Sequence, residues 1–132
     1  MNANATLQLD FDQADLHVHL DALDDAELDA LDFGVIGIDA AGVVNRYNAF
    51  ESNCAGLGKP RVLGHALFTT VAPCMNNFMV AQRFADAADN GTTLDATIDY
   101  VLTLRMRPVK VRLRLVAAPG RSGRYVLVHR PA

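Results

Sequence analysis

The segment from 109 to 115 constrains the fold most, because its side chains alternate strictly between apolar and basic. The apolar positions are Val109, Val111, Leu113 and Leu115, and the basic positions between them are Lys110, Arg112 and Arg114. A period of two is typical of a strand with one buried and one solvated face. Because parallel strands are covered on both faces, this segment predicts a half-buried strand of an antiparallel sheet.

Further β segments and short helices surround that strand in the sequence. The runs 93–105 and 124–130 predict its neighbours, and GVIGI, DAAG and VVNRY predict a β-hairpin over 34–47. Between the hairpin and the later strands lie three helical segments: one from Asn48 to about Gly56, a turn near Pro60, and a helix whose apolar stripe runs from Phe78 to Ala88 and stops at Gly91. The chain thus reads β-β, then small helices, then three longer strands.

The N-terminal 32 residues differ from the rest in composition. Apolar residues recur there near helical spacing, at Leu20, Leu23, Ala26, Leu28 and Leu31. We therefore expect one amphipathic helix in an N-terminal cap, residues 1–32, on a core formed by residues 33–132. At 132 residues the chain is long enough for one core, so the two parts form a single domain.

Composition excludes several classes of protein. With 51% hydrophobic and 20% charged residues, the chain is globular rather than disordered. It has no apolar run long enough to span a bilayer, and MNANATLQLDFDQAD lacks the features of a secretory signal. We therefore expect a cytoplasmic protein with no membrane partner. Cys54 and Cys74 form no CxxC pair and are expected to be free thiols.

Charge is divided unevenly along the chain. No Lys or Arg precedes Arg46, and no acid follows Asp99, while the net charge is −3. The basic half could contact nucleic acid, but overall acidity disfavours binding to a phosphate backbone. We therefore predict no nucleic-acid partner and expect the acidic N-terminal segment to lie on the basic strands.

Four blocks of sequence carry a resemblance to a known family. They are RYNAFE at 46–51, GHALFTTVAPC at 64–74, RMRPVKV at 105–111 and RYVLVHR at 124–130. These blocks resemble the photoactive yellow protein family of PAS domains. The resemblance implies an α+β fold, with a five-stranded antiparallel sheet and short helices on one face. It also implies a blue-light sensor that carries p-coumaric acid as a thioester on a cysteine.

The resemblance assigns roles to five residues. Cys74 matches the thioester cysteine, Tyr47 and Glu51 match the hydrogen-bonding partners of the pigment phenolate, Met106 matches the loop methionine that covers the pigment, and Tyr100 matches an aromatic position of the adjoining strand. Since a buried phenolate needs hydrogen-bond donors, Glu51 must be protonated, and burial beside an anion favours that state. Pro73 places Cys74 ahead of a helix, whose N-terminus would activate the thiol.

The resemblance also implies how a signal would arise. A light-driven loss of the Glu51 proton would loosen the N-terminal cap and signal to a downstream protein whose identity the sequence does not give.

Three departures from the family pattern keep a second interpretation open. Ala55 stands at a hydroxyl position, Leu57 at an arginine position and Leu104 at a common tyrosine position. A PAS module without pigment would instead bind a small ligand or another protein, and would self-associate as a homodimer through an exposed sheet or cap. A third interpretation, a thiol enzyme that carries an acyl group transiently on Cys74, needs a base that the sequence does not place there. We therefore predict a protein without enzyme activity.

Two other sets of polar residues have simpler explanations. His17 and His19 would share one face of a strand, but a metal ion needs three or four converging ligands, so no metal site is predicted. Asn76 and Asn77 most simply satisfy loop backbone or cap the next helix.

Overall fold

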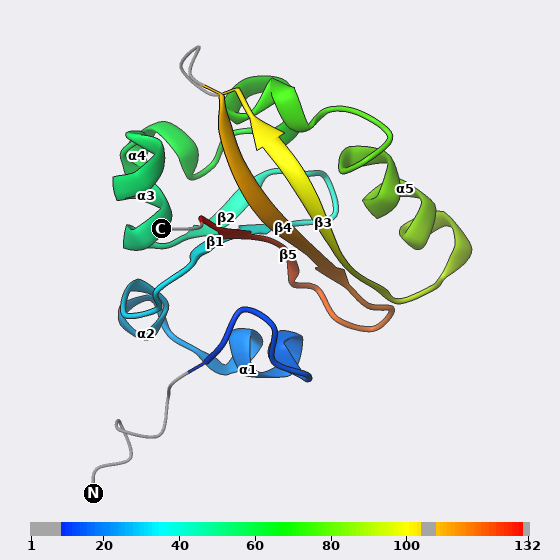
Figure 1. The fold of residues 1–132 in the computed structure, drawn as a ribbon. Helices are drawn as coiled ribbons and strands as arrows, with labels where there is room; N and C mark the ends of the chain where they lie inside the picture. Colours follow the sequence, from blue (N-terminus) through cyan, green and yellow to red (C-terminus); the bar gives the residue numbers. More distant parts are fainter. Residues whose placement is uncertain (1–8, 104–107, 131–132) are drawn as a thin grey trace, which may run out of the picture.

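The computed structural model describes residues 9–103 and 108–130. Within them, five strands form one antiparallel sheet in the order β2-β1-β5-β4-β3 (Figure 1). The strands are β1 (Gly34–Ile38), β2 (Val44–Tyr47), β3 (Leu94–Leu102), β4 (Val109–Ala117) and β5 (Arg124–His129). Every named pairing is antiparallel, and β1 pairs with both β2 and β5. The predicted α+β class, the five-stranded sheet and the hairpin over 34–47 are confirmed.

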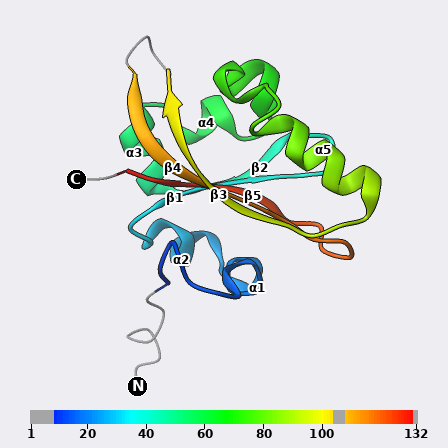
Figure 2. The ribbon, with the colours of Figure 1, turned by 45° about the vertical axis from the view of Figure 1, so that its right-hand side comes forward.

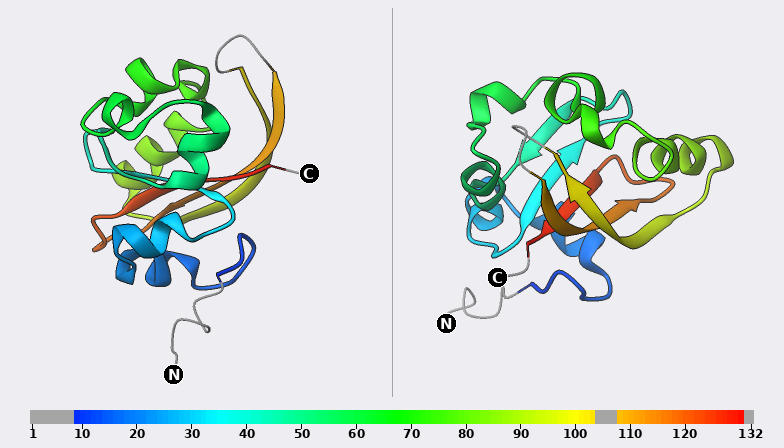
Figure 3. Two further views of the ribbon diagram at one scale, coloured as in Figure 1. Left: turned by 90° about the vertical axis from the view of Figure 1, so that its left-hand side faces the viewer. Right: turned by 45° about the horizontal axis from the view of Figure 1, so that its top comes forward.

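The two faces of the sheet carry different parts of the chain. The helices α3 (Ala49–Ala55), α4 (Lys59–Val62) and α5 (Ala81–Asn90) lie on one face, whereas α1 (Leu16–Ala22) and α2 (Asp25–Asp29) lie on the other (Figures 2 and 3). No helix within the described ranges has the length and apolar character to cross a bilayer. The division into residues 1–32 and 33–132 stays a prediction.

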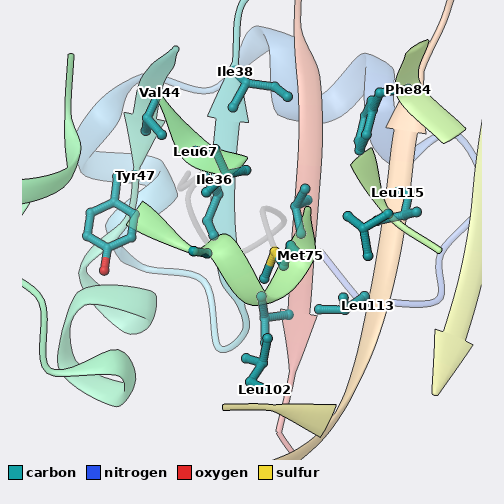
Figure 4. Packing of buried hydrophobic residues seen from close by; sticks show 14 of the residues in the cluster. Ile36, Ile38, Val44, Tyr47, Leu67, Met75, Phe84, Leu102, Leu113 and Leu115 are labelled. Carbon is teal, nitrogen blue, oxygen red and sulfur yellow. The ribbon is translucent and has the colours of Figure 1, made fainter. Parts of the chain in front are cut away.

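Each face has its own buried cluster of hydrophobic residues. The helix-side cluster consists of Ile36, Ile38, Val44, Tyr47, Val62, Leu67, Ala72, Met75, Val80, Phe84, Leu102, Val111, Leu113, Leu115, Ala117, Val126 and Val128. The N-terminal-side cluster consists of Leu9, Phe11, Leu16, Leu20, Leu23, Leu28, Leu31, Phe33, Val35, Val116, Tyr125 and Leu127. In the first cluster Met75 lies near Leu102 and Leu113, and Tyr47 is at the flank (Figure 4). The sheet is therefore buried on both faces over much of its area.

Strand β4 follows the predicted alternation only in part. Val111, Leu113 and Leu115 are buried on the helix side, but Val109 is 41% exposed. On the opposite face Arg114 is buried, since its guanidinium donates to the carbonyls of Phe11 and Gln13 in the N-terminal segment.

The N-terminal segment forms two short helices instead of the single helix predicted. The break falls at Leu23 and Asp24, both with extended backbone. The Asp24 carboxylate accepts from the backbone N–H of Glu27, and the Glu27 carboxylate accepts from that of Asp24. This capping box starts a new helix, which the continuous leucine spacing concealed. His17 accordingly lies on α1 rather than on a strand, with Nε2 2.8 Å from the Gly123 carbonyl oxygen.

Arginine side chains attach this segment to the sheet. Arg46 of β2 donates to the carbonyls of Leu20 and Leu23, at 2.8 and 2.5 Å. Arg121 pairs with Asp21 at 2.7 Å. The expected contact between the acidic N-terminal segment and the basic C-terminal part is therefore present.

The helices that lead to the site have well-defined ends. Asn48 caps α3 through its side chain, and Gly56 ends that helix with a left-handed φ of 70°, as predicted. Helix α5 ends at Gly91 as predicted, but it begins at Ala81 rather than near Phe78, which is 79% exposed. The cause is a turn in which the Asn77 side-chain oxygen accepts from the backbone N–H groups of Met79 and Val80.

Candidate functional site

Tyr47 brings a buried phenol to the helix side of the sheet. It ends β2, is 5% exposed, and donates its hydroxyl proton to the carbonyl of Leu57 at 3.0 Å. Burial raises the pKa of Tyr47, and the nearby charge of Glu51 adds to the rise. The phenol therefore keeps its proton and remains a hydrogen-bond donor. The Leu57 carbonyl, which also accepts from the Ser52 hydroxyl at 2.9 Å, gives Tyr47 a partner where Ala55 offers none.

Glu51 is a carboxyl group held almost out of contact with solvent. It lies on α3 and is 1% exposed. Its Oε1 and Oε2 accept from the two terminal nitrogens of Arg130, at 2.6 and 3.1 Å. Burial raises the pKa of Glu51, and the hydrogen bonds and charge of Arg130 oppose that rise. A Cβ at Gly34 would lie 2.0 Å from Oε1, so a glycine in β1 makes room for the carboxylate.

Cys74 lies in a short 3-10 turn, Pro73–Met75, and is half-buried beside the helix-side cluster. The Tyr100 hydroxyl donates to the Cys74 carbonyl at 2.5 Å, and the Asn77 amide nitrogen donates to the same carbonyl at 3.2 Å. Asn77 also donates to the Tyr100 hydroxyl at 2.6 Å. Helix α5 does follow Cys74 along the chain, as predicted, but it begins only at Ala81.

The structure places three of the five predicted site residues in or against the helix-side cluster, and a fourth, Glu51, close to Tyr47. Tyr47 belongs to the helix-side cluster, and Cys74 and Tyr100 pack against it. Glu51 joins them through its electrostatic effect on Tyr47. Met106, like the departure at Leu104, lies outside the described residues.

Sequence reasoning missed Arg130, Gly34 and the contact of Asn77 with the Tyr100 hydroxyl. Arg130 follows the last strand, far along the chain from Glu51, so only the folded sheet brings the two together. Asn77 was expected to serve the loop backbone or to cap a helix, and it does bind backbone groups at Cys74, Met79 and Val80.

An open apolar hollow of about 890 Å³ adjoins the Cys74 turn. Its described lining is Asn77, Met79, Asp99, Tyr100, Val101, Lys110, Val111, Arg112 and His129. Tyr47, Glu51 and Cys74 are not among these lining residues, so within the described part of the chain the hollow meets the site at Asn77 and Tyr100.

Comparison with known proteins decides the family. No model of a known protein family matches the chain. The photoactive yellow proteins of Rhodothalassium salexigens and Halochromatium salexigens are each 32% identical to it over 120 residues, covering 91% of this chain and 95% of theirs. The chain belongs to the photoactive yellow protein family.

Solved structures agree with this family assignment. The photoactive yellow protein domain of the sensor histidine kinase Ppr from Rhodospirillum centenum is 39% identical, with a TM-score of 0.78, over 86% of this chain and 98% of that one. A PAS domain from Colwellia psychrerythraea, at 12% identity and a TM-score of 0.61, shares the fold alone. The predicted PAS fold is therefore confirmed, and family membership makes the chain a PAS domain of the photoreceptor type.

Proposed function

We propose that the chain is a blue-light photoreceptor in which Cys74 carries p-coumaric acid as a thioester, with Tyr47 and Glu51 beside its phenolate. One observation carries this proposal. In a chain of the photoactive yellow protein family, Tyr47 lies in the helix-side cluster, Cys74 packs against the same cluster, and the buried Glu51 lies near enough to Tyr47 to raise its pKa.

The residues present fit such a pigment. The half-buried Cys74 is a thiol that an activated acyl group can reach, and Tyr47 retains a proton to donate to an anion. Two adjustments are needed. Tyr47 must turn its proton from the Leu57 carbonyl to the phenolate, and Glu51 must gain a proton in order to donate.

Bound at Cys74, the pigment supplies a double bond that isomerises in blue light. The residues around it position and solvate its two ends. Tyr100 and Asn77 hold the Cys74 carbonyl, so the turn is already fixed before acylation. Tyr47 and protonated Glu51 would donate short, charge-assisted hydrogen bonds to the phenolate. Met106 would cover the pigment.

The finer consequences belong to the same proposal. With its pigment the protein would act in the cytoplasm and pass its signal to a downstream protein by loosening the N-terminal segment. No enzyme activity is proposed.

The direct test is reconstitution with activated p-coumaric acid, followed by intact mass and the visible spectrum. We expect one adduct, lost in Cys74→Ala and retained in Cys54→Ala, with a visible band that bleaches in blue light and recovers in the dark. An adduct that absorbs only in the near ultraviolet would mean that the site does not hold a phenolate. If no adduct forms, the photoreceptor proposal fails.

One observation favours the second candidate, a PAS module without pigment. Tyr47 and Glu51 already have partners within the chain, at Leu57 and Arg130, so the site needs no ligand to satisfy them. Under this candidate, reconstitution yields no adduct and sedimentation shows a homodimer at micromolar concentration. A monomer that forms the adduct would exclude it.

A further inference from the structure

The Glu51–Arg130 pair is the ion pair whose carboxylate is most buried among those of the described residues. The Glu51 side chain is 2% exposed and that of Arg130 is 16% exposed. In the other pairs at least 25% of the carboxylate side chain is exposed. Neither member can be removed without leaving a charge in a region of low dielectric constant.

Among the described residues, few titratable groups surround this pair. The groups with an electrostatic effect on Arg130 are Glu51 and Cys54 from α3 and Tyr47 from β2. Glu51 and Arg130 in turn both act on Tyr47. A guanidinium keeps its proton at any pH at which a protein folds. Counting only residues 9–103 and 108–130, the region therefore contains one permanent positive charge, and it is electrically neutral when it contains one negative charge.

We propose that Arg130 balances a single negative charge in this site, which resides on Glu51 when no pigment is bound and on the pigment phenolate when it is. The part of this inference that concerns the phenolate rests on the proposed function. The part that concerns Glu51 in the protein without pigment follows from the bidentate geometry of the Glu51–Arg130 pair.

The transfer of charge requires one proton to move. If the pigment enters as a neutral phenol, its O–H bond breaks and an O–H bond forms on a Glu51 oxygen. Glu51 then becomes neutral and the ring oxygen becomes negative, so the site keeps the same total charge. Protonated Glu51 can now donate to that oxygen, whereas ionised Glu51 can only accept. Two adjacent anions facing one guanidinium would be much less stable in a buried site.

Arg130 also connects this charge to the N-terminal segment. It follows His129 directly, and the His129 ring lies against the Phe11 ring with centroids 5.3 Å apart. A shift of the Arg130 backbone would therefore also displace the neighbouring His129 ring, whose contact with Phe11 holds the N-terminal segment on the sheet. Loss of the Glu51 proton in light would restore the Glu51–Arg130 attraction at this point.

The first arm of the test uses the protein without pigment. Glutamate carboxyl carbons are labelled with ¹³C, and the Glu51 resonance is assigned by its loss in Glu51→Gln. We expect Glu51 to be ionised at neutral pH in the wild type. In Arg130→Gln its proton affinity should rise by roughly tenfold or more, which is one pKa unit or more. Arg112→Gln, which breaks an exposed pair with Asp99 on the neighbouring strands, is the matched control and should leave the resonance unchanged.

A protonated Glu51 in the wild type at neutral pH would overturn the inference, as would an unchanged titration in Arg130→Gln. If that variant does not fold, Arg130→Lys keeps the charge and loses the bidentate geometry. Its Glu51 proton affinity should then lie above that of the wild type, and equality with the wild type would also overturn the proposal.

The second arm repeats the measurement after attachment of p-coumaric acid. The Glu51 resonance should become that of a protonated acid. In Arg130→Gln, the pH at which the band moves from the near ultraviolet to the visible should rise, because the phenolate lacks its cation. If that pH stays the same in Arg130→Gln, the proposal that Arg130 balances the charge of the phenolate is overturned. Failure to form any adduct would reject the proposed function and the part of the inference that concerns the phenolate together, while the first arm still decides the part that concerns Glu51.

Discussion

Arg46 and Tyr47 are neighbours in β2 whose side chains lie on opposite faces of the sheet. Arg46 donates to the carbonyls of Leu20 and Leu23, so it faces the N-terminal helices. Tyr47 donates to the Leu57 carbonyl on the helix side. Consecutive residues of one strand therefore serve the two faces of the sheet: Arg46 holds the N-terminal segment and Tyr47 belongs to the candidate site. This follows from the alternation of side chains along a strand.

Replacing Arg46 by Ala should loosen the N-terminal segment and leave the site in place. Loss of hydrogen bonds from a charged group should lower the free energy of unfolding by about 2 kcal/mol. Limited proteolysis should show faster cleavage between α1 and α2. Arg61→Ala, which alters an exposed arginine of α4, is the control. Equal protection of the segment in both variants would count against this role of Arg46.

Asn48 should be among the least replaceable residues. It is fully buried, and its amide oxygen accepts from the N–H groups of Val35 and Glu51, while its amide nitrogen donates to the carbonyls of Leu28 and Phe33. Asn48→Ala leaves these backbone groups without partners and removes the cap of α3. We expect a loss of about 3 kcal/mol in urea unfolding. Asn53→Ala, at an exposed position of the same helix, should cost far less.

Removing the Tyr100 hydroxyl should free the Cys74 turn. In a Cys54→Ser background Cys74 is the remaining thiol, so its labelling by a thiol reagent can be followed alone. Tyr100→Phe removes the hydrogen bond to the Cys74 carbonyl, and Cys74 should then be labelled several times faster, with a stability loss of about 1 kcal/mol. Unchanged labelling would show that Asn77 alone suffices to fix the turn.

Asp95 should contribute to stability at neutral pH but not in acid. Its hydrogen bonds to Arg114 hold the pKa of Asp95 below its usual range, despite partial burial. A carboxyl with a lowered pKa in the folded state stabilises the protein above its unfolded pKa of about 3.9, and that stabilisation disappears as the pH falls through the folded pKa. Because the side chain is 46% exposed, screening limits the effect to roughly 1 kcal/mol or less. Urea unfolding of Asp95→Asn and wild type should differ at neutral pH and converge in acid, once the pH has fallen below the lowered pKa of Asp95.

Gly34 should resist even the smallest substitution. A methyl group there would collide with Oε1 of Glu51, so Gly34→Ala must displace the carboxylate from Arg130 or shift β1 away from α3. We expect a loss of about 2 kcal/mol in unfolding experiments, together with a changed Glu51 titration. Gly58→Ala is the matched control, because the nearest atom to its added methyl, Pro60 Cδ, is 3.7 Å away.

The sheet could be predicted from the sequence because its signals are local. Alternation in 109–115 and the turn residues between GVIGI and VVNRY depend on neighbouring positions only. The N-terminal helix was predicted wrongly because helical leucine spacing continues across Asp24, where the capping box interrupts the backbone. Phe78 was placed on a helix stripe because the competing hydrogen bonds of Asn77 leave no mark on hydrophobic periodicity.

The candidate site was predictable only where the family motif names its residues. Tyr47, Glu51 and Cys74 come from such motifs, and their roles stay proposals. Arg130 could not be found in this way, because its pairing with Glu51 depends on the position of β5 beside β1. Burial of Arg114 beneath Phe11 was hidden for a related reason, since an alternating basic residue normally faces solvent.

Strand β5 separates the two hydrophobic clusters residue by residue. Tyr125 and Leu127 belong to the N-terminal-side cluster, and Val126 and Val128 to the helix-side cluster. Insertion of a single residue would exchange the two sets and turn every one of these side chains toward the wrong partner. The length of β5 is therefore under stricter constraint than the identity of any one of its residues. Variation in length among related chains should fall instead in the exposed turn at Pro119 and Gly120.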